Sequence, residues 1–138
     1  MEKAGCDISK FIKIRQDFHQ NAEIAFKEFK TQQKLISILL SFGLEKESIT
    51  KIAGTGLVVD LKGTNSSSSR KVKTIALRAD IDALPMPEHN HDLPYKTVTP
   101  YAHMCGHDGH MAMLLAAAQL VIKNRHKMSS EQTVRLLF

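Results

Sequence analysis

A long apolar segment between two short strand-like segments constrains the fold of this 138-residue chain more than any other feature. Residues 108–124 are rich in Ala, Leu and Met and are nearly apolar all round, which predicts a well-buried helix. Residues 72–77 and 133–138 are short, apolar and β-branched, which predicts strands, the first of them buried. A strand, a loop, a helix and a strand in this order predict a βαβ unit, and therefore an α/β fold.

Two amphipathic helices are expected nearer the N-terminus. Residues 8–20 place apolar side chains at helical spacing, and Ser9 is a candidate N-cap. Residues 28–42 repeat the same pattern and stop at Gly43, a residue type that favours helix C-termini. Both helices are interpreted as structural.

A further strand is expected in the middle of the chain. Gly54-Thr-Gly56 predicts a turn, and the apolar residues 57–61 that follow predict a strand. Residues 63–71 are polar and of low complexity, which is typical of an exposed loop. We therefore expect a hairpin in which 57–61 pairs antiparallel with 72–77.

Composition and charge exclude several classes of protein. The apolar fraction of 43% is enough for a core, so one domain or a piece of a larger one is expected. The sequence contains no run of about 18 apolar residues, so a membrane span is not expected. The net charge of +5 is spread along the chain. The loose basic cluster Arg70–Lys73 has no accompanying nucleic-acid-binding motif. Met1–Cys6 shows no secretory signal, so a cytoplasmic protein is the default expectation.

Residues 102–110 carry the most chemistry, with three imidazoles, one thiol and one carboxylate in nine residues. Thiolate and neutral imidazole are good ligands for a borderline-soft divalent metal. Cys105 and His107 could hold one ion, because Gly106 between them lets the backbone bend sharply. The other cysteine, Cys6, stands near the chain terminus and is interpreted as inert.

The neighbours of this pair leave alternatives open. His103 or His110 could be a further ligand or a supporting residue, and Asp108 could accept a hydrogen bond from a ligand imidazole. The alternative is an ordinary polar helix start, with Asp108 as a cap and surface histidines. Cys105 could also be a nucleophile paired with a histidine, although such dyads usually assemble from distant parts of a sequence.

A second candidate motif follows the strand at 72–77. Asp80 and Asp82 alternate along an extended segment, so their carboxylates share one face and could bind a metal or orient a histidine. A polar strand end in which Arg78 neutralises one of them is the alternative. The loop of about 20 residues at 85–104 is long enough to be functional or disordered.

The remaining histidines suggest structural or surface roles. His19 and Glu23 are spaced as an i,i+4 pair on a helix end, which predicts a surface feature. His89 and His91 lie in the long loop. They could coordinate a metal, but solvated histidines on a mobile loop are the preferred interpretation.

Four segments together resemble a known family. They are His-Gln-Asn-Ala-Glu-Ile-Ala-Phe-Lys-Glu at 19–28, Gly-Thr-Gly-Leu-Val at 54–58, Leu-Arg-Ala-Asp-Ile-Asp-Ala-Leu-Pro at 77–85 and His-Met-Cys-Gly-His-Asp-Gly-His at 103–110. In this order they resemble the N-terminal part of the metallopeptidase family 20 amidohydrolases, in the branch of hippurate hydrolases, auxin–amino-acid conjugate hydrolases and bacterial N-acyl-amino-acid amidohydrolases. The last two segments are the most specific.

The resemblance implies an α/β/α sandwich of the zinc-dependent exopeptidase type and a centre of two divalent metal ions, zinc or manganese. Cys105 and His107 would be metal ligands, and Asp82 would be the active-site aspartate that steadies them. Four more residues would support the site from behind the ligands, namely Asp80, His103, Asp108 and His110. The substrate would be a small N-acyl amino acid or conjugate, with no nucleic acid and no membrane involved, and such enzymes are often homodimers.

The chain also departs from the family pattern. Ala22 and Met104 stand where proline and alanine are usual, and neither change removes a ligand. After a strand like the one ending at Phe138, the family continues with a Glu-Glu pair that supplies the general base and a ligand, then with two histidine ligands and a lid or dimerisation domain. We therefore expect residues 1–138 to form a partial catalytic domain with no general base.

Three expectations follow for the chain on its own. It should bind metal poorly and show little catalysis, since the base and at least half of the ligands are missing. An alternative of another class is a non-catalytic fragment or binding module that keeps only the fold. Unpartnered apolar faces and an open sheet edge predict aggregation unless another chain covers them.

Overall fold

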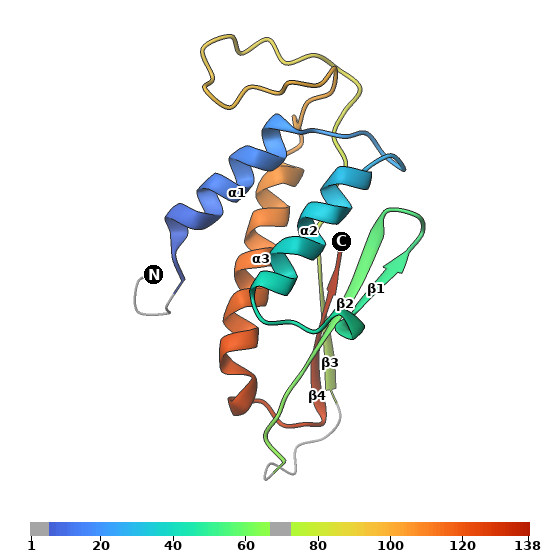
Figure 1. Cartoon of the computed structure of the whole chain (residues 1–138), viewed down its shortest axis with the longest axis vertical. Helices are drawn as coiled ribbons and strands as arrows, with labels where there is room; N and C mark the ends of the chain where they lie inside the picture. Colours follow the sequence, from blue (N-terminus) through green and yellow to red (C-terminus); the bar gives the residue numbers. More distant parts are fainter. Residues whose placement is uncertain (1–5, 67–72) are drawn as a thin grey trace.

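The computed structural model describes residues 6–66 and 73–138. Its helices are α1 (Ile8–Gln20), α2 (Phe29–Ser41) and α3 (His107–Asn124), with short 3₁₀ turns η2 (Lys46–Ser48) and η3 (Arg125–Lys127). Its strands are β1 (Ile49–Ile52), β2 (Gly56–Lys62), β3 (Lys73–Arg78) and β4 (Gln132–Leu137). Figure 1 shows the three helices on one side of the sheet, so the described residues form two layers.

The four strands form one sheet in the order β1-β2-β4-β3. Strand β4 pairs antiparallel with β2 and parallel with β3. The predicted βαβ unit is therefore confirmed as β3–α3–β4. The predicted hairpin of 57–61 with 72–77 is wrong, because β4 lies between β2 and β3. Residues 67–72 of the expected loop and strand lie outside the described residues.

Strand β3 differs from the sequence expectation in its burial. All six of its residues are exposed, although the apolar run predicted a buried strand. The reason is its place in the sheet: among the described strands β3 is at the edge and pairs with β4 alone, and Ile75 and Leu77 are 49% and 37% exposed. Strand β2 lies inside the sheet and buries Leu57, Val59 and Leu61 completely.

Strand β1 was not predicted. It pairs antiparallel with β2 across the turn at Ala53 and Gly54, both of which have positive φ. The Gly54–Gly56 turn signal was therefore correct, but it joins two strands. Glycine adopts positive φ without strain, which explains its use in this turn.

The helices agree closely with their predicted ranges and pack a single core on the sheet. Asp7 rather than Ser9 caps α1, since its side chain accepts a hydrogen bond from the Lys10 amide. Gly43 follows α2 with a φ of +87°, the left-handed conformation expected at a helix end. Helix α3 is less buried than predicted, because Met113 on its outer face is 63% exposed.

The long loop at 85–104 rests on the C-terminal end of α1. The Val98 amide donates to the Gln20 carbonyl, and the Thr99 hydroxyl donates to the Ala22 carbonyl. An isolated bridge between Leu84 and Ala102 joins the ends of the loop. Among the described residues, no helix is both long and apolar enough to cross a lipid bilayer.

Candidate metal centre

The two candidate motifs meet at the carboxyl end of β3. The segment after this strand alternates, with Ala79, Ile81 and Ala83 buried in the core. Asp80 and Asp82 therefore share the opposite, half-exposed face, as the alternation predicted. The start of α3 returns to the same place and brings His107 against Asp82.

The His107 ring is fixed by two acceptors on one residue. Its Nδ1 atom lies 3.0 Å from the Asp82 carboxylate and 2.9 Å from the Asp82 carbonyl oxygen. Because both partners can only accept, Nδ1 carries the proton and donates it. The lone pair of Nε2 is then left for another partner, which is the arrangement that carboxylates impose on metal-binding histidines.

Cys105 stands two residues before His107 on an exposed part of the chain. Gly106 between them has a φ of +79° and lies just before α3 begins. The sharp bend that the sequence predicted at this glycine is therefore present. Cys105 and His107 are thus an accessible thiol and an oriented imidazole next to the same turn.

The other predicted site residues lie near this turn in different environments. Asp80 forms an ion pair with Arg78, which was the alternative interpretation for this carboxylate. His110 is exposed on the first turns of α3, and its ring centroid lies 5.7 Å from that of His107. His103 is buried at 4% exposure. Neither ring nitrogen of His103 has a hydrogen-bond partner among the described residues.

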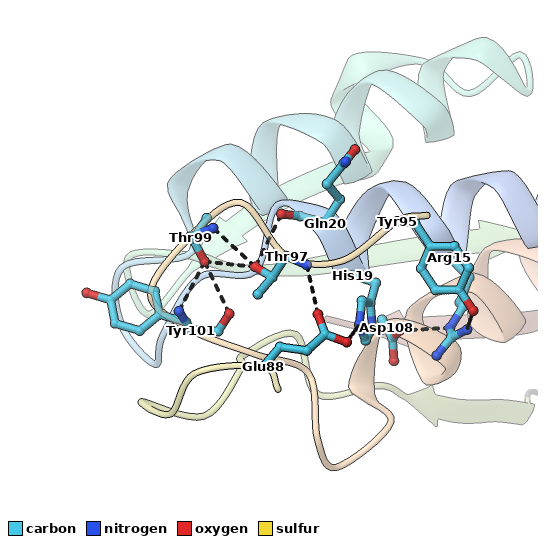
Figure 2. Close-up of polar contacts among 9 residues, drawn as sticks. All are labelled: Arg15, His19, Gln20, Glu88, Tyr95, Thr97, Thr99, Tyr101 and Asp108. Atoms are coloured by element: carbon cyan, nitrogen blue, oxygen red, sulfur yellow. Dashed lines mark hydrogen bonds and ion pairs between the residues drawn. The ribbon is translucent and has the colours of Figure 1, made fainter. Parts of the chain in front are cut away.

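The Asp108 carboxylate contacts Arg15 and His19, and not the imidazole of His107. It is completely buried, and its Oδ2 atom lies 2.9 Å from His19 Nδ1 and 2.8 Å from Arg15 Nε. The Nε2 atom of His19 lies 3.2 Å from Glu88. Figure 2 shows these four side chains converging between α1, the long loop and the start of α3. We call Arg15, His19, Glu88 and Asp108 the buried charge cluster, in which the Arg15 side chain is 37% exposed and the other three are buried.

Local sequence patterns did not predict this cluster, and the spacing of His19 and Glu23 had indicated a surface position for His19. The expected pair with Glu23 is wrong, because Glu23 instead accepts hydrogen bonds from the backbone and hydroxyl of Thr31. The helical spacing of α1 does indicate that His19 is buried. Arg15 and His19 lie on the same face of α1 as the buried Phe11 and Phe18.

Hydrogen bonding explains how these charges are tolerated inside the protein. Each ring nitrogen of His19 lies within hydrogen-bond distance of a carboxylate oxygen, that of Asp108 on one side and that of Glu88 on the other. The Arg15 guanidinium adds a permanent positive charge beside Asp108. Burial raises the pKa of Glu88, but hydrogen bonds from the Thr97 amide and His19 outweigh it and hold this pKa below its usual value.

His103 lies against this cluster without joining its hydrogen bonds. Its ring centroid is 6.5 Å from that of His19. Burial lowers the pKa of His103 from 6.5 to about 4, although the nearby Asp108 carboxylate opposes the shift. His103 is therefore neutral near pH 7.

His89 and His91 are exposed in the long loop, as the sequence predicted. His91 Nδ1 accepts a hydrogen bond from Lys96.

The residues in place fit part of a metal site. The Asp82-oriented imidazole of His107 and the neighbouring thiol of Cys105 are the right donors for zinc. Within residues 6–66 and 73–138, however, no three or more His, Cys, Asp or Glu side chains are arranged to hold an ion. These two ligands would need partners from elsewhere.

A cavity of about 640 Å³ opens beside the oriented imidazole. Its polar part includes Asp80, Asp82 and His107, and also Glu28, Thr55 and Arg78. The segment before α2 and the β1–β2 turn supply an apolar wall that includes Phe26 and Ile52. The cavity therefore combines charged groups at the carboxyl end of β3 with apolar surface.

Comparison with known proteins agrees with this architecture. Residues 76–138 match the profile of "Peptidase family M20/M25/M40". The chain is 41% identical to thermostable carboxypeptidase 1 of Saccharolobus solfataricus over 92% of its own length and 30% of that protein. It is 43% identical to the hippurate hydrolase of Campylobacter jejuni over 80% of its own length and 27% of that protein.

A solved structure extends the likeness to three dimensions. The YXEP protein of Bacillus subtilis, described as a dinuclear metal-binding peptidase of the M20 family, superposes with a TM-score of 0.80 at 32% identity. The match covers 94% of this chain and 34% of that one. The chain thus spans about a third or less of the relatives it matches. The match over residues 76–138, the fold and these relatives bear out the resemblance to peptidase family M20/M25/M40 that the four motifs carry.

Proposed function

We propose that this chain supplies the Cys105 and His107 ligands of a two-metal centre in an amidohydrolase. The reaction would cleave the amide bond of an N-acyl amino acid or a peptide-like conjugate. The oriented imidazole is the observation that carries this proposal, because Asp82 holds Nδ1 and leaves Nε2 for an ion. The names of the relatives, among them a hippurate hydrolase and N-acetyldiaminopimelate deacetylases, support the substrate class.

Each residue near the turn has a distinct part in this proposal. Cys105 and His107 would hold a zinc or manganese ion, and Asp82 would orient the imidazole. A divalent ion held there would supply Lewis-acid chemistry to the amide carbonyl. Asp108 acts at a distance, since its bonds to α1 fix the first turn of α3 on which His107 stands.

A metal titration tests the ligand assignment on the 138-residue chain itself. Zinc affinity should fall at least about tenfold in Cys105→Ser and His107→Ala, and about 10- to 100-fold in Asp82→Asn. Cobalt binding should give a thiolate charge-transfer band that Cys105→Ser abolishes. The matched controls are Cys6→Ser and His126→Ala, which remove the other cysteine and an exposed histidine far along the chain.

The controls make the outcome decisive. Equal zinc affinity in Cys6→Ser and Cys105→Ser would refute a metal site at the turn. We expect weak binding by the wild-type chain, because the described residues offer two donors where catalytic zinc sites have three protein ligands.

A turnover assay separates the two candidate roles of the isolated chain. With added zinc or manganese, we expect little hydrolysis of N-benzoylglycine, since no third ligand is placed at the turn by the described residues. This deficit also favours a second candidate, a module that binds without catalysis. Clear metal-dependent turnover by the 138-residue chain would exclude that module and overturn the expected inactivity.

A further inference from the structure

The segment 19–28, singled out in the sequence, contains a residue that the metal site does not use. Phe26 is 80% exposed, more than any other large apolar residue among those described. It also has a φ of +63°, a left-handed conformation that a bulky side chain rarely adopts. Neither packing nor conformational preference accounts for a phenylalanine at this position.

The backbone around Phe26 is firmly held. Ile24 forms a parallel bridge with Ala83, and the Ala83 amide donates to the Glu23 carbonyl at 2.8 Å. The Lys27 amide donates to the Ile24 carbonyl, which closes a turn with Phe26 at its third position. Positive φ there ordinarily calls for Gly or Asn. The unfavourable conformation is thus imposed by a turn anchored beside Asp82.

The next residues anchor the other end of this turn. Glu28 is buried at 5% exposure, and its carboxylate accepts a short hydrogen bond from the Thr55 hydroxyl. Glu23 accepts hydrogen bonds from the Thr31 backbone and hydroxyl at the start of α2. Hydrogen-bonded carboxylates on both sides, of which Glu28 is buried and Glu23 partly exposed, therefore hold the backbone that carries the exposed Phe26 ring. Residues held in such strained conformations are concentrated at ligand sites.

The fixed position of Phe26 is on the cavity beside His107. Phe26 and Ile52, which is itself 42% exposed, contribute to the apolar wall, while Asp80, Asp82 and His107 belong to the polar part. An N-acyl amino acid has the same division, with an amide at its centre and an acyl group attached to it. The cavity thus offers an apolar surface to a group bonded directly to the reacting amide.

We propose that Phe26 is a specificity-determining residue that contacts the apolar acyl group of the substrate. This inference rests on the proposed function for the location of the amide. It goes further in naming the residue that selects large apolar acyl groups over small ones. An aromatic side chain supplies a large apolar contact with little loss of conformational freedom, which suits this role.

Binding of two ligands to the 138-residue chain tests the proposal without turnover. N-benzoylglycine and N-acetylglycine differ only in the acyl group, and their dissociation constants can be measured by NMR titration. We expect the wild-type chain to prefer the benzoyl ligand by about tenfold, the lower end for an added apolar contact. Phe26→Ala should remove most of this preference while leaving the acetyl ligand unaffected.

Phe29 provides the matched control. It is 57% exposed, lies three residues further along and does not line the cavity, so Phe29→Ala should keep the preference. Phe26→Gly should lose the preference and remain as thermally stable as the wild type, since glycine accommodates the positive φ. An unchanged preference in both Phe26 variants, or no preference in the wild type, would overturn the proposal.

The result is separable from that of the metal titration. Metal binding at Cys105 and His107 without an acyl preference would refute the role of Phe26 and leave the proposed function standing. An acyl preference that depends on Phe26, without metal binding at the turn, would support the role of Phe26 and refute the proposed metal site.

Discussion

Two histidine–carboxylate pairs flank the start of α3, and they differ in almost every physical respect. The His107 and Asp82 side chains are 21% and 33% exposed, and one ring nitrogen is left without a partner from this pair. The His19 and Asp108 side chains are 6% and 1% exposed, and both ring nitrogens of His19 are engaged. The same two chemical groups therefore make an open site in one place and a closed anchor in the other.

The difference arises from one step along a helix. His107 and Asp108 are adjacent in the sequence, and successive residues of an α-helix point about 100° apart. His107 lines the cavity. Asp108 instead points to Arg15 and His19 of α1, as Figure 2 shows. Within one short motif, His107 is thus placed for binding, and Asp108 fixes the backbone that carries it.

The largest expected effect is on the closed pair. Asp108→Asn keeps the size of the side chain but removes the buried carboxylate that Arg15 and His19 contact. Removing one partner of a buried ion pair typically costs about 3–5 kcal/mol. We expect a loss of this size in the free energy of unfolding, measured by urea denaturation at pH 7.

Asp82→Asn is the control for this experiment. Its side chain is 33% exposed, and water can solvate what the substitution leaves unpaired. We expect it to lose less than about 1 kcal/mol of stability while weakening metal binding. If the two variants lose equal stability, the distinction between an open and a closed pair is wrong.

The next effect is a pH dependence that comes from His103 beside the closed cluster. Burial lowers the pKa of its folded form to about 4, below its usual 6.5. The unfolded chain therefore takes up a proton first as the pH falls, and stability is lost between about pH 6.5 and 4. At about 1.4 kcal/mol for each pKa unit, the fall from 6.5 to about 4 corresponds to a loss of about 3.5 kcal/mol.

Urea denaturation at several pH values, with EDTA present, measures this loss. His103→Phe should flatten the profile over that interval, because a buried ring without hydrogen-bond partners can be replaced by an apolar one. Below pH 4.5 a further decline should remain in the variant, since the lowered pKa of Glu88 also loses its stabilising effect there. A profile that is the same in wild type and variant would contradict the shift.

Local signals in the sequence predicted the helices and the candidate turn well. Helix α1 was predicted at its observed bounds, and α2 and α3 within one residue at each end. The bend at Gly106 followed from the freedom of glycine, and the shared face of Asp80 and Asp82 followed from strand alternation. These features depend on neighbours in the chain, which a sequence displays directly.

Features that depend on distant contacts could not be predicted in the same way. Apolar composition in β3 does not reveal that β4 covers only one of its edges. The position of β4 between β2 and β3 is decided by the whole sheet. Glu88 and His19 are in contact but are separated by 69 residues in the sequence. No local sequence pattern could therefore predict the buried charge cluster.

The smallest effect is expected for a third charged pair, which tests whether pairing or burial decides the cost. Arg135 on β4 donates two hydrogen bonds, of 2.8 and 2.7 Å, to Asp60 directly opposite on β2. The hydrogen bond from Arg135 lowers the pKa of Asp60, but their side chains are 46% and 32% exposed. Water and salt screen such pairs, so Asp60→Asn should lose only about 0.5 kcal/mol. Urea denaturation in low and high salt measures the loss, which should shrink as salt is added. A loss as large as that of Asp108→Asn would mean that good pairing geometry, and not burial, distinguishes the anchor from the open site.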